Sequence, residues 1–386
     1  MKKIYFNKNQ IAPLVTIFIF IVLIFGGTAA GFFHKDRLFS ETENRFLEQK
    51  PAITVKSFFE GKFATDYEKY ITDQFFMRDN WIFIKTMAEM AVGKKDISGV
   101  YLSKDNYLLE CHDDIDEEKA YKNADRMAAF VNRMAQEFGT GHVSIMIVPT
   151  ATSILSDKLP WMAPSFDQNA YIDYIKEKTD GIFVDVRESL LSHKDEYIYY
   201  KTDHHWTSRG AYLAYRSFCD AKGYLAFDEE AFDVELAADD FLGTIYSKIN
   251  YAKQSDEIYI YKIKEPVKYH VEYNAGEKES DSLFETEHLM TKDKYSVFLN
   301  GNNAVVTIDT KGGQEDGDTL LVIKDSYAHC FVPFAANHYK KIVMIDLRYL
   351  KMPVSRVIEE YGITDVLVLY NTVHFAKDTN LSLIEK

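Results

Sequence analysis

Segments with a continuous apolar centre that alternate with helical segments are the feature that most constrains the fold of this 386-residue chain. In the C-terminal third, the segments TLLVIK, KIVMI and DVLVLY are separated by stretches with a helical pattern. An earlier apolar segment, VSIMIV, follows a helical pattern over 116–138. Segments that are apolar throughout are typical of parallel strands, because helices cover both faces of a parallel sheet. We therefore predict an α/β fold, a three-layer sandwich with a parallel sheet.

Residues 225–318 interrupt this alternation. They are rich in turn residues, and polar and apolar residues alternate in segments such as DEIYIYKI and KYSVFL. This pattern predicts a β-rich insertion. Outside it, IFVDV is expected to form a strand, GVYLSKDNYLLE a hairpin, and 168–178 a helix. Another helix should follow TDHHW, with Thr207 or Ser208 as its N-cap and Gly223 at its end.

The N-terminus combines a basic segment with an uncharged run. Three lysines lie within residues 1–10, and no charged residue occurs over 11–33. About 20 apolar residues are enough for a helix to cross a bilayer, and the lysines favour a cytoplasmic start. The run over 11–33 therefore predicts an N-terminal transmembrane helix, a single-pass anchor in the cell membrane with the rest of the chain extracytoplasmic. The small residues TAAG leave a cleaved signal peptide as the alternative.

The rest of the chain divides into two parts. Over 34–95, aromatic residues recur at helical spacing in a polar background, which predicts a membrane-proximal helical arm. Residues 96–386 then form one domain that includes the β-rich insertion. The formal net charge of −14 argues against a nucleic-acid partner, because phosphates need a basic surface. The sequence has no glycine-rich phosphate loop, and we expect no cofactor.

A serine follows one of the predicted parallel strands. Ser326 comes after TLLVIK and Asp325, and a helical pattern begins directly after it. Reactive groups in such sheets collect at the carboxyl ends of the strands, and the first amides of the next helix can hold a developing oxyanion. Serine is also a common helix cap. Ser326 is therefore a candidate nucleophile if a base lies near it.

The segment Thr-Asp-His-His-Trp over 202–206 contains a candidate base. Asp203 and His205 are two residues apart, so in an extended segment both side chains leave the backbone on the same side. Asp203 could then orient the imidazole of His205, whose other nitrogen would take a proton from a serine hydroxyl. Trp206 would shield the imidazole from water. His204 would point the opposite way, as a contact for substrate.

The same segment has a second interpretation as a metal site. Asp203, His204 and His205 are possible ligands of zinc or iron, and His329 or His374 could complete the set. However, the side chains of adjacent histidines diverge, and the sequence has no His-x-x-x-His helix. Its three cysteines are far apart and offer no closely spaced pair. We therefore expect no metal.

Several motifs carry a resemblance to a known family. TDHHW followed by TSRGAY, and KDSYAHCFVPF further on, resemble the DHHW family, which is similar to the alginate O-acetylation proteins of the SGNH-hydrolase-like group. ENRFL, DQFFMRDNW, GVYL, FLGTIYSK, YSVFLNGN and IDLRY occur in the expected order. The resemblance implies an SGNH-hydrolase-like fold in permuted order, with Asp203 as the acid, His205 as the base and Ser326 as the nucleophile.

This resemblance also implies a function. The chain would be an extracytoplasmic O-acetyltransferase that passes acetyl groups, through an acetyl-serine, to hydroxyls of a cell-surface or exported polysaccharide. A multi-pass membrane O-acyltransferase would be its partner and acetyl donor. One alternative is a carbohydrate acetylesterase, because water and a sugar hydroxyl are both nucleophiles. The other is a non-catalytic scaffold of a polysaccharide export complex.

Three further residues are candidates for binding substrate or oxyanion. Asn371 follows DVLVLY and could join the Ser326 amide as an oxyanion donor, although an asparagine there could equally cap a loop. Tyr327 could line the acceptor site or simply pack in the core. Arg348 could bind the acceptor or pair with Asp346.

Overall fold

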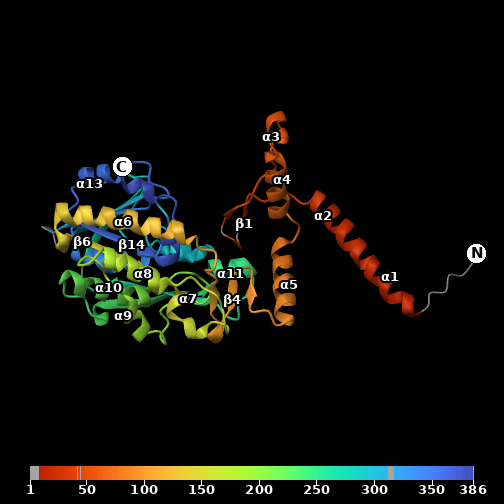
Figure 1. Ribbon diagram of the computed structural model, residues 1–386, viewed down its shortest axis with the longest axis horizontal. Helices are drawn as coiled ribbons and strands as arrows, with labels where there is room; N and C mark the ends of the chain where they lie inside the picture. Colours follow the sequence, from red (N-terminus) through yellow and green to blue (C-terminus); the bar gives the residue numbers. More distant parts are fainter. Residues whose placement is uncertain (1–7, 41, 44, 266, 312–316, 386) are drawn as a thin grey trace, which may run out of the picture. The chain divides into compact units, whose positions relative to one another are not determined.

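The computed structural model describes residues 8–385 except 41, 44, 266 and 312–316, and the chain divides into two compact units, Met1–Ala91 and Val92–Lys386. The second unit is built on a seven-stranded sheet (Figure 1). Four neighbouring strands of it are parallel, and the remaining three extend it in antiparallel fashion. In order across the sheet the strands are β10 (Lys278–Ser280), β9 (Lys268–Tyr273), β11 (Val305–Lys311), β13 (Lys341–Ile345), β12 (Thr319–Lys324), β14 (Asp365–Asn371) and β6 (Val143–Val148).

The two faces of the sheet bury separate hydrophobic cores. In β12, Leu320 and Val322 belong to one core, while Leu321 and Ile323 belong to the other, because successive side chains of a strand point to opposite faces. This confirms the predicted α/β fold with helices on both faces of the sheet, but the sheet is mixed: only its four strands from β13 to β6 are parallel. The first core includes residues of α10 (Ser208–Lys222) and α12 (Ala328–Ala335); the second includes residues of α6 (Glu117–Phe138), α8 (Gln168–Lys178), α13 (Val354–Tyr361) and α14 (Thr372–Lys377).

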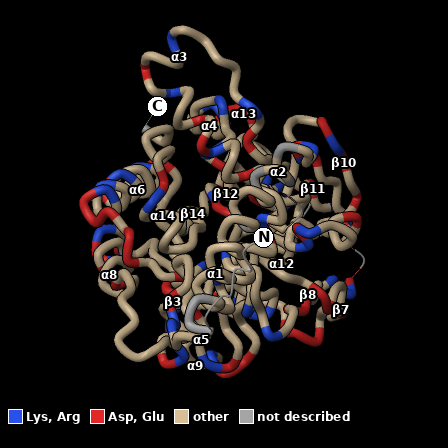
Figure 2. Tube along the Cα trace, turned by 90° about the vertical axis from the view of Figure 1, so that its right-hand side faces the viewer, with Lys and Arg blue, Asp and Glu red and all other residues tan. Residues whose placement is uncertain are grey.

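The outer helices are amphipathic, as their sequences predict. Charged positions are frequent along α6 and α8 (Figure 2), whose apolar residues contribute to the second core. Asp116 caps the first turn of α6 by accepting from the amide of Lys119 at 3.1 Å. In α10, Thr207 is the N-cap, and Gly223 ends the helix in the left-handed conformation that glycine adopts at low cost. These helix boundaries agree with the predictions.

The predicted β-rich insertion over 225–318 is not one separate subdomain. Among the described residues of this segment, only β7 (Phe232–Phe241) and β8 (Asp256–Ile263) form a ribbon of their own. The strands β9, β10 and β11 instead join the main sheet, because Val306 and Ile308 of β11 are buried against β9 and β13. The helix α11 (Thr244–Ile249) lies between β7 and β8 in the chain.

Another predicted strand, IFVDV, forms only a single bridge. Phe183 pairs with Ile145 of β6 in parallel fashion, through hydrogen bonds from the Ile145 amide to Ile182 and from the Val184 amide to Ile145. The ladder stops there because α9 (Arg187–Ser192) begins a few residues later. The predicted hairpin, in contrast, is present as β4 (Val100–Leu102) and β5 (Leu108–Glu110).

The first unit contains the helices α3 (Val55–Phe59), α4 (Lys62–Asp73) and α5 (Arg78–Ala91). A short hairpin of β1 (Phe39–Ser40) and β2 (Arg45–Phe46) precedes them. Its Arg45 forms a two-pronged ion pair with the buried Asp73 of α4, at 2.6 and 2.7 Å. The helical content predicted for 34–95 is therefore present within this unit.

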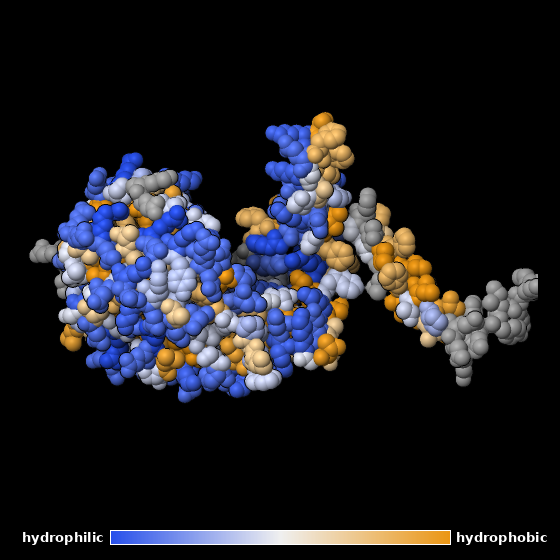
Figure 3. Space-filling model, in the orientation of Figure 1, coloured by the Kyte–Doolittle hydropathy of each residue, from blue (hydrophilic) through white to orange (hydrophobic). Residues whose placement is uncertain are grey.

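The apolar N-terminal run is helical, but it is divided. It consists of α1 (Lys8–Ile21), a π-helical turn over Val22–Gly26 and α2 (Gly27–Phe33), and its surface is largely hydrophobic (Figure 3). Two adjacent glycines, Gly26 and Gly27, stand where the π-helical turn gives way to α2, and both features are common causes of helix interruption. No helix in the described part of the chain has the length and hydropathy needed to span a membrane, so the single transmembrane helix predicted over 11–33 is not found.

Candidate active site

Ser326 lies in the tight turn between β12 and α12. The turn is at the carboxyl end of β12, which has parallel neighbours on both sides, β13 and β14. The buried carboxylate of Asp325 holds it by accepting from the Tyr327 amide at 2.9 Å and from the backbone and side-chain amides of Asn371 at 2.9 and 2.7 Å. The Ser326 side chain is therefore fixed at the sheet edge, where the residue is 9% exposed.

Asp203 and His205 lie at the tip of a narrow loop between α9 and α10. The base of the loop is closed by a bridge between Tyr199 and Trp206. Asp256, the first residue of β8, then holds the first half of the loop by accepting from the amides of Lys201 and Thr202, both at 2.7 Å. The tip is a bend and not the extended segment predicted from the sequence, because Asp203 Oδ1 accepts from the His205 amide at 3.0 Å.

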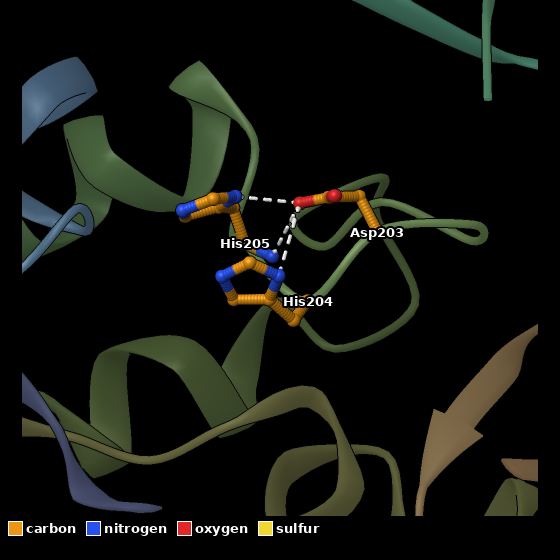
Figure 4. A group of neighbouring side chains, drawn as sticks. All are labelled: Asp203, His204 and His205. Atoms are coloured by element: carbon orange, nitrogen blue, oxygen red, sulfur yellow. Dashed lines mark hydrogen bonds and ion pairs between the residues drawn. The ribbon is translucent and has the colours of Figure 1, made fainter. Parts of the chain in front are cut away.

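The structure brings Asp203, His205 and Ser326 into one hydrogen-bonded chain. Asp203 Oδ1 lies 2.5 Å from His205 Nδ1, and His205 Nε2 lies 2.7 Å from Ser326 Oγ. Figure 4 shows the first of these contacts. Since an ionised carboxylate can only accept, His205 Nδ1 carries the proton and Nε2 accepts from the Ser326 hydroxyl. This is the tautomer in which a histidine can take the proton of a serine nucleophile.

The carboxylate of Asp203 is held from a second side by the residues after β7. Its Oδ2 accepts from the backbone amide of Thr244 at 2.8 Å and from the Thr244 hydroxyl at 3.0 Å. Burial alone would raise the pKa of Asp203, but the imidazoles of His204 and His205 and these hydrogen bonds lower it below its usual range. Asp203 is therefore an anion at neutral pH.

The pKa of Asp203 predicts how the stability of the protein depends on pH. Because the folded-state pKa is lower than the ordinary value of about 3.9, the ionised carboxylate stabilises the fold above about pH 4, and this contribution is lost as the pH falls. We expect Asp203→Asn to destabilise the protein at pH 7, and the difference from wild type to shrink below about pH 4. Urea unfolding of both proteins from pH 7 to pH 3 measures it, and a difference that grows on acidification would contradict the assignment.

Tyr295 covers one face of the His205 imidazole, a role that the sequence suggested for Trp206. The Tyr295 ring stacks on the His205 imidazole with centroids 3.7 Å apart and planes 11° apart, and its hydroxyl lies 3.2 Å from both the Ser326 carbonyl oxygen and Cys330 Sγ. Trp206 packs instead on Tyr327, with ring centroids 5.2 Å apart, and donates to its carbonyl oxygen at 3.0 Å. The indole of Trp206 therefore stabilises the turn that carries Ser326.

Two substitutions at Tyr295 separate its ring from its hydroxyl. Tyr295→Leu removes the flat surface against His205, and we expect turnover to fall about tenfold or more because the imidazole is less well positioned. Tyr295→Phe keeps the stack, and we expect mainly a loss of about 1 kcal/mol in the free energy of unfolding. Steady-state kinetics and denaturant unfolding of both variants measure these effects. Equal losses of turnover in the two variants would rule out the ring as the important part.

The amide of Ser326, predicted as an oxyanion donor, is available for such a role. Within the described residues it donates to no acceptor, and it lies directly before the first turn of α12. Asn371, predicted as a second donor, is engaged elsewhere: its Nδ2 donates to Asp325, and its Oδ1 caps α14 by accepting from the His374 amide at 2.9 Å. The capping alternative is the one that the structure shows.

The structure also places Tyr327, Arg348 and Cys330. Tyr327 is fully buried, and its hydroxyl donates to the His204 carbonyl oxygen at 2.6 Å, so it packs between the two halves of the site. Arg348 forms a two-pronged ion pair with Asp346, at 2.5 and 2.8 Å, which is the alternative noted for it. Burial raises the pKa of Cys330 to about 12, so its thiol stays protonated at neutral pH and is a poor nucleophile.

His204 lies beside His205 and not on the opposite side of the loop as predicted. The two ring centroids are 3.9 Å apart, and His204 Nδ1 lies 2.6 Å from the Thr244 hydroxyl. The side chain of His204 is 32% exposed, against 7% for His205. Of the two histidines, His204 is thus the one at the open side of the site. The Asx turn at Asp203 explains the difference, because it curls the chain back and brings neighbouring side chains together.

The metal interpretation can be tested against this geometry. Asp203, His204 and His205 do offer ligand atoms within 4.8 Å of one another. However, both oxygens of Asp203 already accept hydrogen bonds, from His205 Nδ1 and from Thr244. His329, suggested as a further ligand, lies with its Nε2 2.6 Å from Lys324 Nζ. The donor set therefore fits a hydrogen-bonded triad better than a metal centre.

Three residues at the site were not identified from the sequence, namely Gly243, Thr244 and Tyr295. Gly243 and Thr244 lie within FLGTIYSK, and Tyr295 begins YSVFLNGN. FLGTIYSK was noted for its resemblance to the DHHW family, and YSVFLNGN for that resemblance and for the alternating pattern of KYSVFL. Their occurrence in the expected order was the one available signal, since nothing in their local pattern indicates a contact with residues 203–205.

The fold and the site together define an α/β protein with a Ser–His–Asp triad, in which the serine lies at the carboxyl end of a parallel strand and the histidine and aspartate lie on a neighbouring loop. A model of the family described as DHHW protein matches residues 119–345, and the chain belongs to this family. A sequence search of curated proteins finds no match.

Two solved proteins show the similarity in structure. A DHHW family protein from Eubacterium siraeum is 25% identical with a TM-score of 0.63, over 75% of this chain and 96% of that one. PatB1 from Bacillus cereus is 19% identical with a TM-score of 0.59, over 71% of this chain and 96% of that one. PatB1 has also been solved with a sulfonyl adduct, at a TM-score of 0.58.

Proposed function

We propose that this DHHW protein is an SGNH-hydrolase-like, serine-dependent O-acyltransferase that passes acetyl groups to hydroxyls of a polysaccharide. The observation that carries the proposal is the hydrogen bond of 2.7 Å between His205 Nε2 and Ser326 Oγ, with Asp203 behind the imidazole. Serine alone is a weak nucleophile, and a histidine held in this tautomer is what activates it.

The proposed reaction has two halves. In the first, Ser326 Oγ attacks the carbonyl carbon of an acetyl ester while its proton moves to His205 Nε2, and His205 then gives this proton to the departing donor oxygen. In the second, an acceptor hydroxyl attacks the acetyl-serine and loses its proton to His205, which returns it to Ser326 Oγ. The Ser326 amide stabilises the oxyanion in both halves, and buried Asp203 stabilises the imidazolium.

The donor and the location are further parts of the proposal. We propose that the α/β domain works outside the cytoplasm at the cell membrane. Acetyl groups would reach it from a multi-pass membrane O-acyltransferase. Fractionation of cells and protease protection of the full chain test the location: cleavage of the domain by protease added outside intact spheroplasts is expected, and full protection would contradict it.

The covalent intermediate is the decisive test of the activity. The full-length chain, purified in detergent, would be incubated with an activated acetyl ester, digested and analysed by mass spectrometry. We expect an acetyl group on the peptide that contains Ser326. Ser192→Ala is a matched control, because Ser192 is an exposed serine whose hydroxyl bonds only within its own helix among the described residues.

The outcomes separate the alternatives. Acetyl-Ser326 that is discharged faster by a polysaccharide than by water supports a transferase. Acetyl-Ser326 that is discharged by water at the same rate with or without polysaccharide indicates a carbohydrate acetylesterase. If no adduct forms, and Ser326→Ala releases acetate as fast as wild type, the enzymatic proposal fails and a scaffold becomes the better interpretation.

A further inference from the structure

The imidazole of His204 lies next to that of His205, and the reaction proposed above does not use it. His204 precedes His205, and their rings are 3.9 Å apart with a tilt of 37° between their planes. A hydrogen bond between His204 Nδ1 and the Thr244 hydroxyl holds the side chain of His204 even though it is partly exposed. A fixed, partly exposed imidazole beside a nucleophile is placed to touch a substrate.

The hydrogen bonds of Thr244 determine which nitrogen of His204 carries the proton. The Thr244 hydroxyl has a single hydrogen, which it donates to the ionised Asp203 Oδ2 at 3.0 Å. The Thr244 oxygen, 2.6 Å from His204 Nδ1, must then accept from that nitrogen. Partial burial and the neighbouring His205 lower the pKa of His204, which keeps the ring neutral. His204 Nε2 therefore has a lone pair and acts as a hydrogen-bond acceptor.

The two imidazoles point the same way. In Figure 4, His204 and His205 each turn one nitrogen toward Asp203 and the other nitrogen away from it, on the same side. The nitrogen of His205 on that side is Nε2, the atom that contacts Ser326 Oγ. The Nε2 atoms of both rings thus face the region where an acceptor hydroxyl must approach an acyl-serine. No hydrogen bond to His204 Nε2 occurs among the described residues.

We propose that His204 Nε2 binds a second hydroxyl of the acceptor, next to the one that is acylated, so that the site selects sugar units with two neighbouring free hydroxyls. This inference rests on the proposed function. When the attacking hydroxyl gives its proton to His205, the neighbouring hydroxyl keeps its own proton and donates a hydrogen bond to His204. Water has no second hydroxyl group to hold in this way, so the contact favours transfer over hydrolysis.

The test compares acceptors within each protein. Full-length wild type, His204→Phe and His204→Gln are acetylated on Ser326 with an activated ester, and the adduct is measured first. Each is then given a methyl glycoside with a vicinal diol or its mono-O-methyl counterpart, in which one hydroxyl of the pair is blocked. The ratio of acetylated sugar to free acetate is the readout. Phenylalanine at position 204 keeps a flat ring but has no lone pair that could accept a hydrogen bond. Glutamine restores a hydrogen-bond acceptor, the oxygen of its carboxamide.

We expect wild type to favour the diol over the blocked sugar about tenfold or more in this ratio, since a site that holds a hydroxyl rejects an analogue without it. His204→Phe should lose the preference, and His204→Gln should recover part of it. If Ser326 is acetylated and transfers, but His204→Phe keeps the full preference for the diol, this inference is wrong while the proposed function stands. If wild type forms no adduct on Ser326, the proposed function fails, and the inference falls with it.

Discussion

Ser326→Ala is expected to lower the rate of acetyl transfer about 10⁴-fold or more, because without Oγ no covalent intermediate can form. The change should leave the fold intact, since it removes a single hydroxyl whose described partner is His205, at 2.7 Å. The rate of product formation from an activated acetyl ester measures the first effect, and denaturant unfolding measures the second.

A double mutant shows whether the residues act as one unit. If His205 works only through Ser326, then the variant with both Ser326→Ala and His205→Ala should be no slower than Ser326→Ala alone, because members of a triad are strongly non-additive. His270→Ala is a control for loss of an imidazole, since His270 lies on β9, away from the triad in the chain, and is partly exposed. Additive losses from Ser326→Ala and His205→Ala would mean that the two side chains act independently.

Gly243→Ala is expected to have the second-largest effect, about 100-fold or more on turnover. A Cβ at Gly243 would overlap the Cβ and the carboxylate of Asp203, and the carboxylate is fixed by hydrogen bonds. The carboxylate would have to move away from His205, and misplacement of a catalytic group by about 1 Å can cost on the order of 10²-fold. We also expect a loss of about 1–3 kcal/mol in stability from overpacking.

The chain offers a matched control for this glycine. A Cβ at Gly141 meets no atom within 4 Å, and neither Gly141 nor Gly243 has a positive φ. Gly141→Ala should therefore leave turnover within about twofold of wild type, in line with a surface substitution. Steady-state kinetics of the two variants side by side gives the comparison. A Gly243→Ala variant as active as Gly141→Ala would show that Asp203 can shift without consequence.

The sequence alone was sufficient for the main layers and for the two segments that carry the triad. The strands β6, β12, β13 and β14 are mostly apolar because both faces are buried, and the composition of each segment indicates this burial without reference to the rest of the chain. The same holds for Ser326, whose place after a strand and before a helix follows from the local pattern. Such features depend only on the residues of one segment and its period.

The strand pairing of residues 268–311 could not be obtained in this way. Alternating segments predict antiparallel strands, but they do not say whether these pair among themselves or with another sheet. In the structure, β11 joins the main sheet beside β13, while β7 and β8 form a separate ribbon. The choice depends on which buried surfaces fit together, and that is a property of the whole domain.

The sequence by itself determined that this chain has a parallel α/β core, a serine at a strand end and an acid–base pair two residues apart. Only the tertiary structure decided what surrounds them: Thr244 and Gly243 against Asp203, Tyr295 against His205, and His204 beside the base. For Thr244, Gly243 and Tyr295 the physical reason is their distance along the chain from residues 203–205, whereas for His204 it is the turn at Asp203. A residue pattern records the burial of its own segment, whereas contacts between residues 40 to 120 positions apart depend on how separate segments pack.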